Sequence, residues 1–205
     1  MEKFTVHTGQ AAPLRASNVD TDQIIPVRFL TRLTKAGHGQ DLFADWRDDP
    51  EFVLNRQPYD RATILVAGTD FGTGSSREGA VYALTDHGFR AIIAPRFGDI
   101  FTGNAHQNGL LPVVVPAPVV ERLWELLERE PTAPVTVDLV TRTVRADGVE
   151  CRFDVPAEVR DRLLAGLDDI GTTLQHTEDI AAYEARRRPA LPTTTRQRGP
   201  GRGHP

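Results

Sequence analysis

Short apolar runs alternate with helix-like segments in the middle of the chain, and this alternation constrains the fold more than any other feature of the sequence. The runs are rich in β-branched residues and are bounded by glycine or proline, as buried strands are. The segments between them have helix-like patterns that end at glycines. A strand–helix–strand–helix–strand order predicts an α/β fold with a partly parallel sheet. The three runs are ATILVAG (62–68), RAIIAP (90–95) and LLPVVVP (110–116), and the helix-like segments are 76–88 and 96–109.

The second half of the chain adds helices and a hairpin. Residues 119–130, VVERLWELLERE, have the apolar spacing of an amphipathic helix. Apolar and polar residues alternate over 135–155 around Asp147-Gly148, a pair that is typical of a β-hairpin turn. Two further helical stretches are expected around 157–166 and 178–187.

The first 60 residues are less regular. A polar turn, SNVDTDQIIP, leads into two isoleucines and stops at Pro26. Residues 30–42 include Lys35, Gly37 and Gly39 and are expected to form a long mobile loop. Loops of this length in a compact domain are often lids or binding loops.

Composition excludes several classes of protein. With 40% hydrophobic residues in 205, the chain is typical of a globular domain. No apolar run approaches the roughly 18 residues of a membrane span, and the N-terminus has no apolar signal region, so a cytoplasmic location is expected. Cys151 is the only cysteine, which excludes an internal disulfide and an iron–sulfur cluster ligated by this chain alone. The six histidines are scattered without metal-site spacing.

Charge is unevenly distributed along the chain. The chain has 24 basic and 28 acidic residues, and six of its arginines fall in residues 186–205, which contain no acid. The remaining body keeps 18 basic against 28 acidic residues, which argues against nucleic-acid binding there. We therefore expect one domain over residues 1–185 and a disordered basic tail over residues 186–205.

The stretch FGTGSSREG (71–79) follows the first apolar run and opens a helix-like segment. It lacks the lysine of a P-loop, and Arg77 replaces the third glycine of a dinucleotide fingerprint. Ser75 and Glu78 have the spacing of a helix capping box, which needs no function. Two leading glycines and an arginine in the first helical turn favour an anion site instead, because a helix N-terminus and a guanidinium both bind carboxylates. The residues alone leave these two interpretations open.

Four ordered blocks resemble the swivelling domains of the aconitase superfamily and, within it, the small subunits of 3-isopropylmalate dehydratase. The resemblance covers roughly residues 1–185. It implies a swivelling β/β/α domain with a mixed, barrel-like sheet flanked by helices. The blocks are NVDTDQIIP (18–26), GTGSSRE (72–78), FGDIFTGNAHQNGLLP (97–112) and GLDDIGTTLQHTEDIAAYE (166–184).

The resemblance implies a hydro-lyase of leucine biosynthesis. Such an enzyme removes water from 2-isopropylmalate and adds it back to give 3-isopropylmalate. In this family a [4Fe–4S] cluster on a separate large subunit binds the dicarboxylate substrate as a Lewis acid, and the smaller chain completes the site. No nucleic acid, membrane or metal of its own is expected for this chain.

The resemblance also assigns site residues by position. Ser75 matches the catalytic serine, which takes a proton from a substrate carbon as its alkoxide. Ser76 and Arg77 match a pair that grips a substrate carboxylate. Thr21 and Asp22 match residues that line the site. The site residues implied are Ser75, Ser76, Arg77, Thr21, Asp22 and Arg28, with Arg32 as the alternative to Arg28 for a further substrate arginine.

One departure from the family pattern stands out. Gly79 occupies the position where the family usually has histidine after SSRE. The substrate therefore stays open at this point among 2-isopropylmalate and related acids, namely citraconate or methylmalate and homoaconitate. A hypothesis of another class is a non-catalytic module that binds anions or RNA through the arginine-rich tail.

Overall fold

The computed structural model describes residues 1–30, 36–75 and 77–187. The chain divides into two compact units, Met1–Asp169 and Ile170–Pro205. We call the first unit the body, and we call the described residues 170–187 of the second unit the C-terminal arm. The domain over 1–185 and the tail over 186–205 remain predictions, and most of that tail lies outside the described residues.

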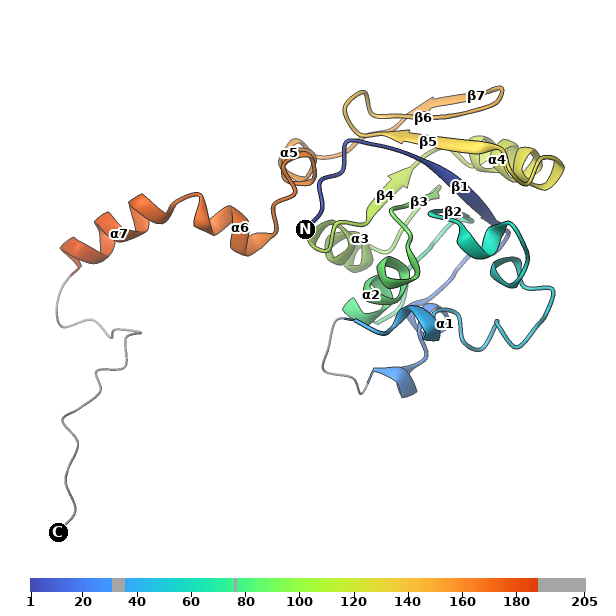
Figure 1. Cartoon of the computed structure of the whole chain (residues 1–205), viewed down its shortest axis with the longest axis horizontal. Coiled ribbons are helices and arrows are strands. Elements are labelled where there is room, and N and C mark those ends of the chain that lie inside the picture. The colour runs from blue at the N-terminus through green and yellow to red at the C-terminus, as the bar shows by residue number, and fades with distance from the viewer. Residues whose placement is uncertain (31–35, 76, 188–205) are drawn as a thin grey trace, which may run out of the picture. The chain divides into compact units, whose positions relative to one another are not determined.

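A seven-stranded mixed sheet forms the centre of the body, in the order β4-β3-β2-β1-β5-β6-β7. Strand β1 pairs in parallel with β2 and antiparallel with β5, so it joins a parallel half to an antiparallel half. The antiparallel half curls over α4 and gives the sheet the form of a half-barrel (Figure 1). The strands are β1 (Val6–Leu14), β2 (Ile64–Ala67), β3 (Ala91–Ala94), β4 (Leu111–Val114), β5 (Pro134–Asp138), β6 (Thr143–Ala146) and β7 (Val149–Arg152).

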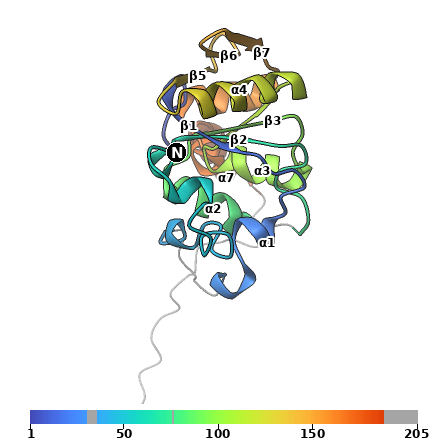
Figure 2. The same cartoon turned by 90° about the vertical axis from the view of Figure 1, so that its right-hand side faces the viewer.

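Helices cover both faces of this sheet. Helices α2 and α3 pack on one face, and α4 packs on the other, between the parallel strands and the curled antiparallel strands (Figure 2). The helices of the body are α1 (Thr21–Ile24), α2 (Glu78–His87), α3 (Asp99–Gln107), α4 (Ala117–Arg129) and α5 (Ala157–Ala165), with 3₁₀ turns η1 (Val27–Phe29), η2 (Gly39–Asp41), η3 (Val53–Asn55) and η4 (Tyr59–Arg61).

Two apolar cores explain why strands β2 and β3 are apolar at every position. In β2, Leu65 and Ala67 join the core beneath α2 and α3, whereas Ile64 and Val66 join the core beneath α4. Alternate side chains of a strand point to opposite faces, so a strand covered on both sides has no polar position. Trp124 fixes α4 to this sheet, because its buried indole N–H donates a 2.8 Å hydrogen bond to the carbonyl of Val66.

The predicted α/β order is confirmed. The three apolar runs form β2, β3 and β4, which pair in parallel. Helix α2 ends at Gly88, whose φ of +114° belongs to the left-handed region that glycine favours. The predicted hairpin is β6–β7, with Asp147-Gly148 at its turn. The expected barrel-like mixed sheet flanked by helices is therefore present.

The structure adds elements that the sequence patterns did not predict. Strand β1 lies at the centre of the sheet although its sequence, VHTGQAAPL, contains glycine, proline and polar residues. The long loop predicted over 30–42 falls partly on residues 31–35, outside the described residues. Its remainder contains η2 and is attached to α2, because Gly37 and His38 donate backbone hydrogen bonds of 2.6 and 2.9 Å to the Asp86 carboxylate.

The C-terminal arm contains two helices. Helix α7 (Thr177–Arg186) matches a predicted helical stretch, whereas α6 (Asp169–Leu174) begins at the end of the body and was not predicted. None of the described helices is long and apolar enough to span a membrane.

Candidate active site

Two loops meet where the parallel strands β1 and β2 end. Each loop follows the carboxyl end of its strand, and in α/β sheets ligands bind at that edge, where neighbouring connections diverge. Backbone hydrogen bonds join the loops along their length, from Asn18 to Thr69 at 2.8 Å, from Gly72 to Val19 at 2.7 Å and from Thr21 to Thr73 at 3.0 Å.

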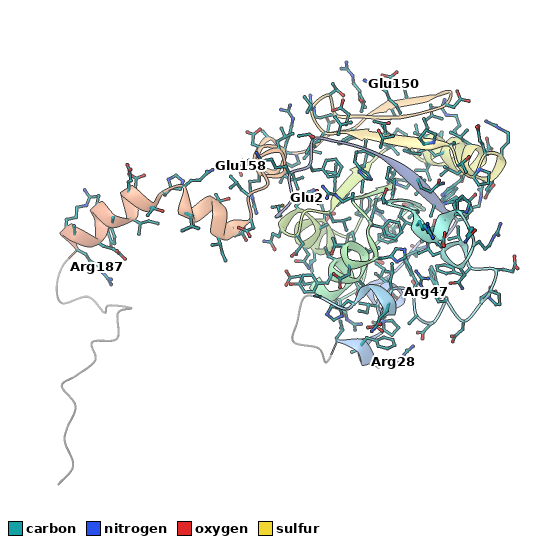
Figure 3. All side chains as sticks on the ribbon, in the orientation of Figure 1. Glu2, Arg28, Arg47, Glu150, Glu158 and Arg187 are labelled. Carbon is teal, nitrogen blue, oxygen red and sulfur yellow. The ribbon has the colours of Figure 1, made fainter. Side chains whose placement is uncertain are left out.

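These loops lie at the end of the body that holds α1. Figure 3 shows Arg28, just after α1, at this end, and Glu150 on the β6–β7 hairpin at the opposite end. The loops that carry the predicted site residues therefore lie on the parallel side of the sheet, far from the curled hairpin.

The two glycines of the GTG motif have the conformation that the motif predicts. Gly72 and Gly74 have φ of +73° and +86°, which only glycine adopts readily. A Cβ atom on Gly72 would overlap the ring of Phe101 on α3. A Cβ atom on Gly74 would lie 3.4 Å from the Cβ of Asp20, so this loop passes close to the start of α1.

Of the two interpretations of FGTGSSREG, the capping box at Ser75 and Glu78 is wrong. Helix α2 begins at Glu78, its N-cap residue is Arg77, and no side chain of the described residues caps it. The glycine conformations and an extended Arg77 delay the helix start, so Ser75 lies too far upstream to cap. The Glu78 carboxylate instead accepts a 3.0 Å hydrogen bond from the side-chain amide of Asn108.

A capping box is present at the neighbouring helix α1. The Asp20 side chain accepts from the backbone N–H of Gln23 at 2.8 Å, and the Gln23 side chain accepts from the backbone N–H of Asp20 at 2.9 Å. This box orients the first turn of α1, which presents Thr21 and Asp22 to the second loop.

Thr21 and Ser75 are joined directly. The hydroxyl of Thr21, which is 2% exposed, donates a 2.9 Å hydrogen bond to the carbonyl oxygen of Ser75. The Ser75 residue itself is exposed. The buried Thr21 side chain thus fixes the backbone of Ser75, while Ser75 itself is exposed to solvent.

Arg77 and Asp22 form an ion pair between α1 and the start of α2. The Arg77 side chain is mostly buried, whereas the Asp22 side chain is exposed. Within the described residues, Nη1 is the guanidinium nitrogen that makes this contact. A guanidinium has five N–H groups in a planar fork, so the remaining ones are available to a bound carboxylate.

Arg28 does not join this group. It lies in η1, pairs with Asp45 at 2.5 Å and places its guanidinium 4.6 Å from the ring centroid of Phe29. Ser76 and Arg32, which are also predicted site residues, lie outside the described residues. The structure therefore brings together Thr21, Asp22, Ser75 and Arg77, and it holds Arg28 in another pair.

A second ion pair at the same edge has no counterpart in the sequence predictions. Asp70, after β2, accepts a hydrogen bond from Arg96, after β3, and this bond holds the pKa of the Asp70 carboxyl below its ordinary range. Asp70 adopts a φ of +63°, and the backbone N–H of Phe71 bonds to the carbonyl of Arg96 at 3.1 Å. The sequence signal for this pair is that Arg96 directly follows the predicted strand 90–95 and that Asp70 follows the predicted strand 62–68 after one residue, Thr69.

Two large hollows among the described residues of the body lie away from Ser75. One, of about 510 Å³, is bordered by residues including Leu14, Phe52 and Tyr59. Another, of about 600 Å³, lies between the loop at Gly37 and the end of α2 at His87. Neither includes Ser75 or Arg77 in its lining.

The donor set of the chain does not fit an iron–sulfur cluster. Cys151 is the single cysteine, on β7 at the edge of the sheet, and a cubane cluster needs several thiolates. Within residues 1–30, 36–75 and 77–187 no group of three or more His, Cys, Asp or Glu side chains is arranged to hold a metal ion.

Family models match most of the chain. The model for the aconitase C-terminal domain matches residues 1–118, and a model described as LeuD_N matches residues 121–157. The model for the C-terminal domain of the 3-isopropylmalate dehydratase small subunit matches residues 169–197.

Curated relatives and a solved structure agree with these models. The 3-isopropylmalate dehydratase small subunit of Thermobifida fusca is 58% identical over 95% of this chain and 100% of its own length. That of Acidothermus cellulolyticus is 60% identical over 96% of this chain and 99% of its own. The crystal structure of a 3-isopropylmalate dehydratase from Methanocaldococcus jannaschii is similar with a TM-score of 0.63 and 26% identity, over 87% of this chain and 99% of that one. The chain belongs to the family of 3-isopropylmalate dehydratase small subunits, in the aconitase superfamily.

Proposed function

We propose that this chain is the small subunit of a 3-isopropylmalate dehydratase. The enzyme interconverts 2-isopropylmalate and 3-isopropylmalate by dehydration and rehydration through 2-isopropylmaleate, a step of leucine biosynthesis. The observation that supports this most strongly is the arrangement of Ser75, Thr21 and the Arg77–Asp22 pair at one sheet edge, in a chain that is 58% and 60% identical to two named small subunits.

Ser75 is proposed as the base that removes a proton from a substrate carbon. A serine hydroxyl is a poor base at neutral pH unless its surroundings stabilise the alkoxide. The positive end of the α2 dipole and the Arg77 guanidinium both lie next to Ser75 in the chain and favour the anionic form. The hydrogen bond from Thr21 fixes the Ser75 backbone, so its position does not depend on the substrate.

Arg77 is proposed to bind a substrate carboxylate, together with Ser76. The exposed Asp22 carboxylate holds the Arg77 fork in place before the substrate arrives, which reduces the ordering cost of binding. Asp22 is thus a positioning residue in this proposal, and Thr21 has the same role for Ser75. Arg28 would have to leave Asp45 before it reached a substrate.

The cluster and the rest of the site are proposed to come from the large subunit. The relatives are named small subunits, which implies a large-subunit partner. When bound there, a [4Fe–4S] cluster would supply Lewis-acid chemistry at the substrate hydroxyl. This chain contributes the base and the carboxylate grip, and we infer that the assembled enzyme is cytoplasmic and binds no nucleic acid.

Leu30 is proposed to contact the isopropyl group. It packs against the first core at the end of η1 and lies over Gly79 in the first turn of α2, two residues beyond Arg77. An apolar side chain at this point suits isopropylmalate, and the names of the relatives favour that substrate over citraconate, methylmalate or homoaconitate. Leu33, a second leucine in the same predicted loop that could contact this group, lies outside the described residues.

The test is co-expression of the full chain with the large subunit of the same source. The purified pair is assayed with 2-isopropylmalate, with methylmalate and with homocitrate. We expect turnover of 2-isopropylmalate with the highest kcat/KM of the three. A pair that prefers another acid would assign the chain to a related hydro-lyase. RNA binding that is lost when residues 186–205 are deleted, without turnover of any acid, would favour the non-catalytic module.

A further inference from the structure

A cavity lies where the end of β1 meets η3, η4 and α4, away from the candidate active site. Its volume of about 510 Å³ falls in the range of small-molecule sites. All of its lining residues belong to the body. We call it the β1 cavity, and its apolar wall includes Leu14, Ala16, Trp46, Phe52, Val53 and Tyr59.

The wall of the β1 cavity presents apolar surface that the core of the body does not cover. Ala16, Trp46, Phe52 and Val53 pack against the core beneath α2 and α3, yet each of them is only partly buried. All four line the cavity. Uncovered apolar surface in a concave site favours an apolar ligand, because binding removes that surface from water.

The aromatic side chains of this wall are held in place by the chain itself. The ring centroid of Trp46 lies 5.2 Å from that of Phe43 in a stacked pair and 5.7 Å from that of Phe52 in an edge-on pair. The buried Tyr59 hydroxyl donates a 2.7 Å hydrogen bond to the carbonyl of Leu127 on α4. The wall is therefore formed before a ligand arrives, which reduces the ordering cost of binding.

Four charged side chains line the β1 cavity, and they differ in how they are paired. Arg15 donates hydrogen bonds of 2.5 and 3.0 Å to the two carboxylate oxygens of Glu128, and one of 3.1 Å to Glu121. Arg56 has a single charged partner among the described residues, Glu51, at 3.9 Å. That distance is too long for a hydrogen bond, so the Arg56 guanidinium keeps N–H groups for a ligand.

We propose that the β1 cavity binds a small apolar carboxylate. Its hydrocarbon or aromatic part lies against Trp46, Phe52 and Tyr59, and its carboxylate is bound by the Arg56 guanidinium, whose planar fork matches that group. Simple monocarboxylic acids and apolar amino acids share this chemistry. The proposal does not rest on the reaction proposed above, because the cavity includes neither Ser75 nor Arg77 in its lining.

The acidic side chains of the cavity argue against a cationic ligand. Both oxygens of Glu128 already accept hydrogen bonds from Arg15. The Glu51 side chain is 84% exposed, so an ammonium group there would stay largely in water and gain little. A carboxylate is therefore the complementary charge for this site.

The test measures the binding of four probes to the purified full-length chain by calorimetry and by tryptophan fluorescence, since Trp46 lies in the wall. The probes are 3-phenylpropanoate, its neutral amide, the cationic 3-phenylpropylamine and L-phenylalanine. We expect 3-phenylpropanoate to bind saturably, with a Kd about tenfold or more below those of the amide and the amine, because they lack the charged bond to Arg56. L-phenylalanine adds an ammonium group, so tighter binding than that of 3-phenylpropanoate would identify an amino acid as the ligand.

Two variants assign the binding to this cavity. Arg56→Gln replaces an exposed side chain, so we expect it to fold normally and to raise the Kd of 3-phenylpropanoate about tenfold, towards that of the amide. Val53→Phe fills part of the cavity and should weaken the binding of every probe. The matched control is Arg61→Gln, at an exposed arginine of η4 outside the lining, which should leave each Kd unchanged.

Three results would overturn the proposal. They are equal Kd values for the acid, the amide and the amine, an unchanged Kd in Arg56→Gln, and no saturable binding of any probe at millimolar concentration. Binding to the free chain that is lost in the complex with the large subunit would also overturn it, because the partner would then cover the cavity. Failure of the proposed function is seen separately, as a complex that binds 3-phenylpropanoate and turns over none of the three acids.

Discussion

The Ser75 side chain is exposed and caps no helix, so its removal tests chemistry with little effect on folding. We expect Ser75→Ala to change the free energy of unfolding by less than about 0.5 kcal/mol, as other exposed substitutions do. The kcat of the complex should fall by about 10²–10⁴-fold, because the base is lost. Ser75→Asp should also be inactive, since its carboxylate repels a dicarboxylate.

Steady-state kinetics with saturating large subunit and thermal melts of the free chain provide the two readouts. The control is Ser17→Ala, at an exposed serine in the loop after β1, which should keep full activity. A Ser75→Ala complex with near-normal kcat would remove the catalytic assignment.

Arg77 should tolerate lysine almost as poorly as alanine. Lysine keeps the charge, but it has no planar fork to hold Asp22 and a substrate carboxylate together. Loss of one charge-assisted hydrogen bond costs about 1.5–3 kcal/mol, or roughly ten- to hundred-fold in kcat/KM. Arg129→Lys, at an exposed arginine on α4, is the matched control. Equal kinetics for both lysine variants would show that Arg77 does not bind the substrate.

Gly79 and Leu30 should be energetically coupled. Glycine in a helix costs up to about 1 kcal/mol relative to alanine, so by helix propensity alone Gly79→Ala, in the first turn of α2, should raise the free energy of unfolding. In this structure a Cβ atom on Gly79 would overlap the Leu30 side chain, so Leu30 has to move. The contacted atom, Cδ2, is the far end of the Leu30 side chain and can move at small cost. We expect Gly79→Ala to keep part of this gain, Gly79→His to lose more of it, and both variants to be stabilised further when Leu30 is alanine.

A double-mutant cycle on Gly79→Ala and Leu30→Ala, followed by urea unfolding, measures this coupling. Contacting residues typically show interaction energies of about 0.5–3 kcal/mol. Additive effects within error would mean that Leu30 does not lie over Gly79. The same variants, assayed for isopropylmalate against a smaller acid, would show whether glycine at this position makes room for the substrate side chain.

At the scale of the element, the end of α2 holds the loop that follows residues 31–35. The Asp86 carboxylate accepts the backbone N–H groups of Gly37 and His38, and His87 follows it at the last helical position. The His87 Nε2 atom is buried and has no hydrogen-bond partner among the described residues. Burial, and after it the charge of Arg47, lowers the pKa of His87 below its ordinary value of 6.5.

This lowered pKa predicts how stability depends on pH. The unfolded chain binds a proton at His87 more readily than the folded chain does, so the stability is fully present above about pH 6.5 and is lost as the pH falls below it. The pKa values of His7 and His106 are lowered by burial in the same direction. We therefore expect the free energy of unfolding to decrease from about pH 7.5 to about pH 5.5.

The His87→Gln variant isolates one part of this decrease. Its free energy of unfolding should fall less steeply over the same pH range, and far-UV circular dichroism in urea at each pH measures it. The urea unfolding curve at about pH 8, where histidine is neutral, gives the reference free energy of unfolding for each protein. A variant with the same pH slope as the original chain would mean that His87 is protonated as easily when folded as when unfolded.

At the scale of the whole molecule, the chain alone should hold no cluster. One cysteine, half-buried on β7, cannot provide the thiolates of a cubane. Anaerobic incubation of the purified chain with iron and sulfide, followed by desalting, should give no visible absorption and no bound iron. The same treatment of the complex should give a brown protein. A stable brown protein from this chain alone would contradict the proposal that the large subunit carries the cluster.

Local sequence patterns were sufficient to predict strands β2, β3 and β4 of the parallel half of the sheet. The apolar runs of β2 and β3 predict strands because every position in them is buried, and β4 is buried at all positions but Val114, so no polar residue obscures the pattern. Helix α4 was predicted from its amphipathic spacing, and the turn at Gly148 from the Asp-Gly pair, both of which are local patterns. Gly72 and Gly74 mark positive φ, as the GTG motif predicts.

Strand β1 and the start of α2 depended on tertiary contacts. The β1 sequence has no strand pattern of its own, and it becomes the central strand because β2 and β5 supply hydrogen-bond partners on its two sides. The capping pattern at Ser75 is overridden because the loop is held by Val19 and Thr21 on another segment, which places the helix start at Glu78.

The sequence by itself determined the apolar strands, the glycine turns and, through four family blocks, which residue types stand at Thr21, Asp22, Ser75 and Arg77. Only the tertiary structure decided that Thr21 holds the Ser75 carbonyl, that Arg77 pairs with Asp22, and that Arg28 pairs elsewhere with Asp45. The physical reason is range. Periodicity and turn chemistry act between residues a few positions apart, whereas these three contacts join residues 54, 55 and 17 positions apart. Their partners depend on how the folded chain brings its loops together.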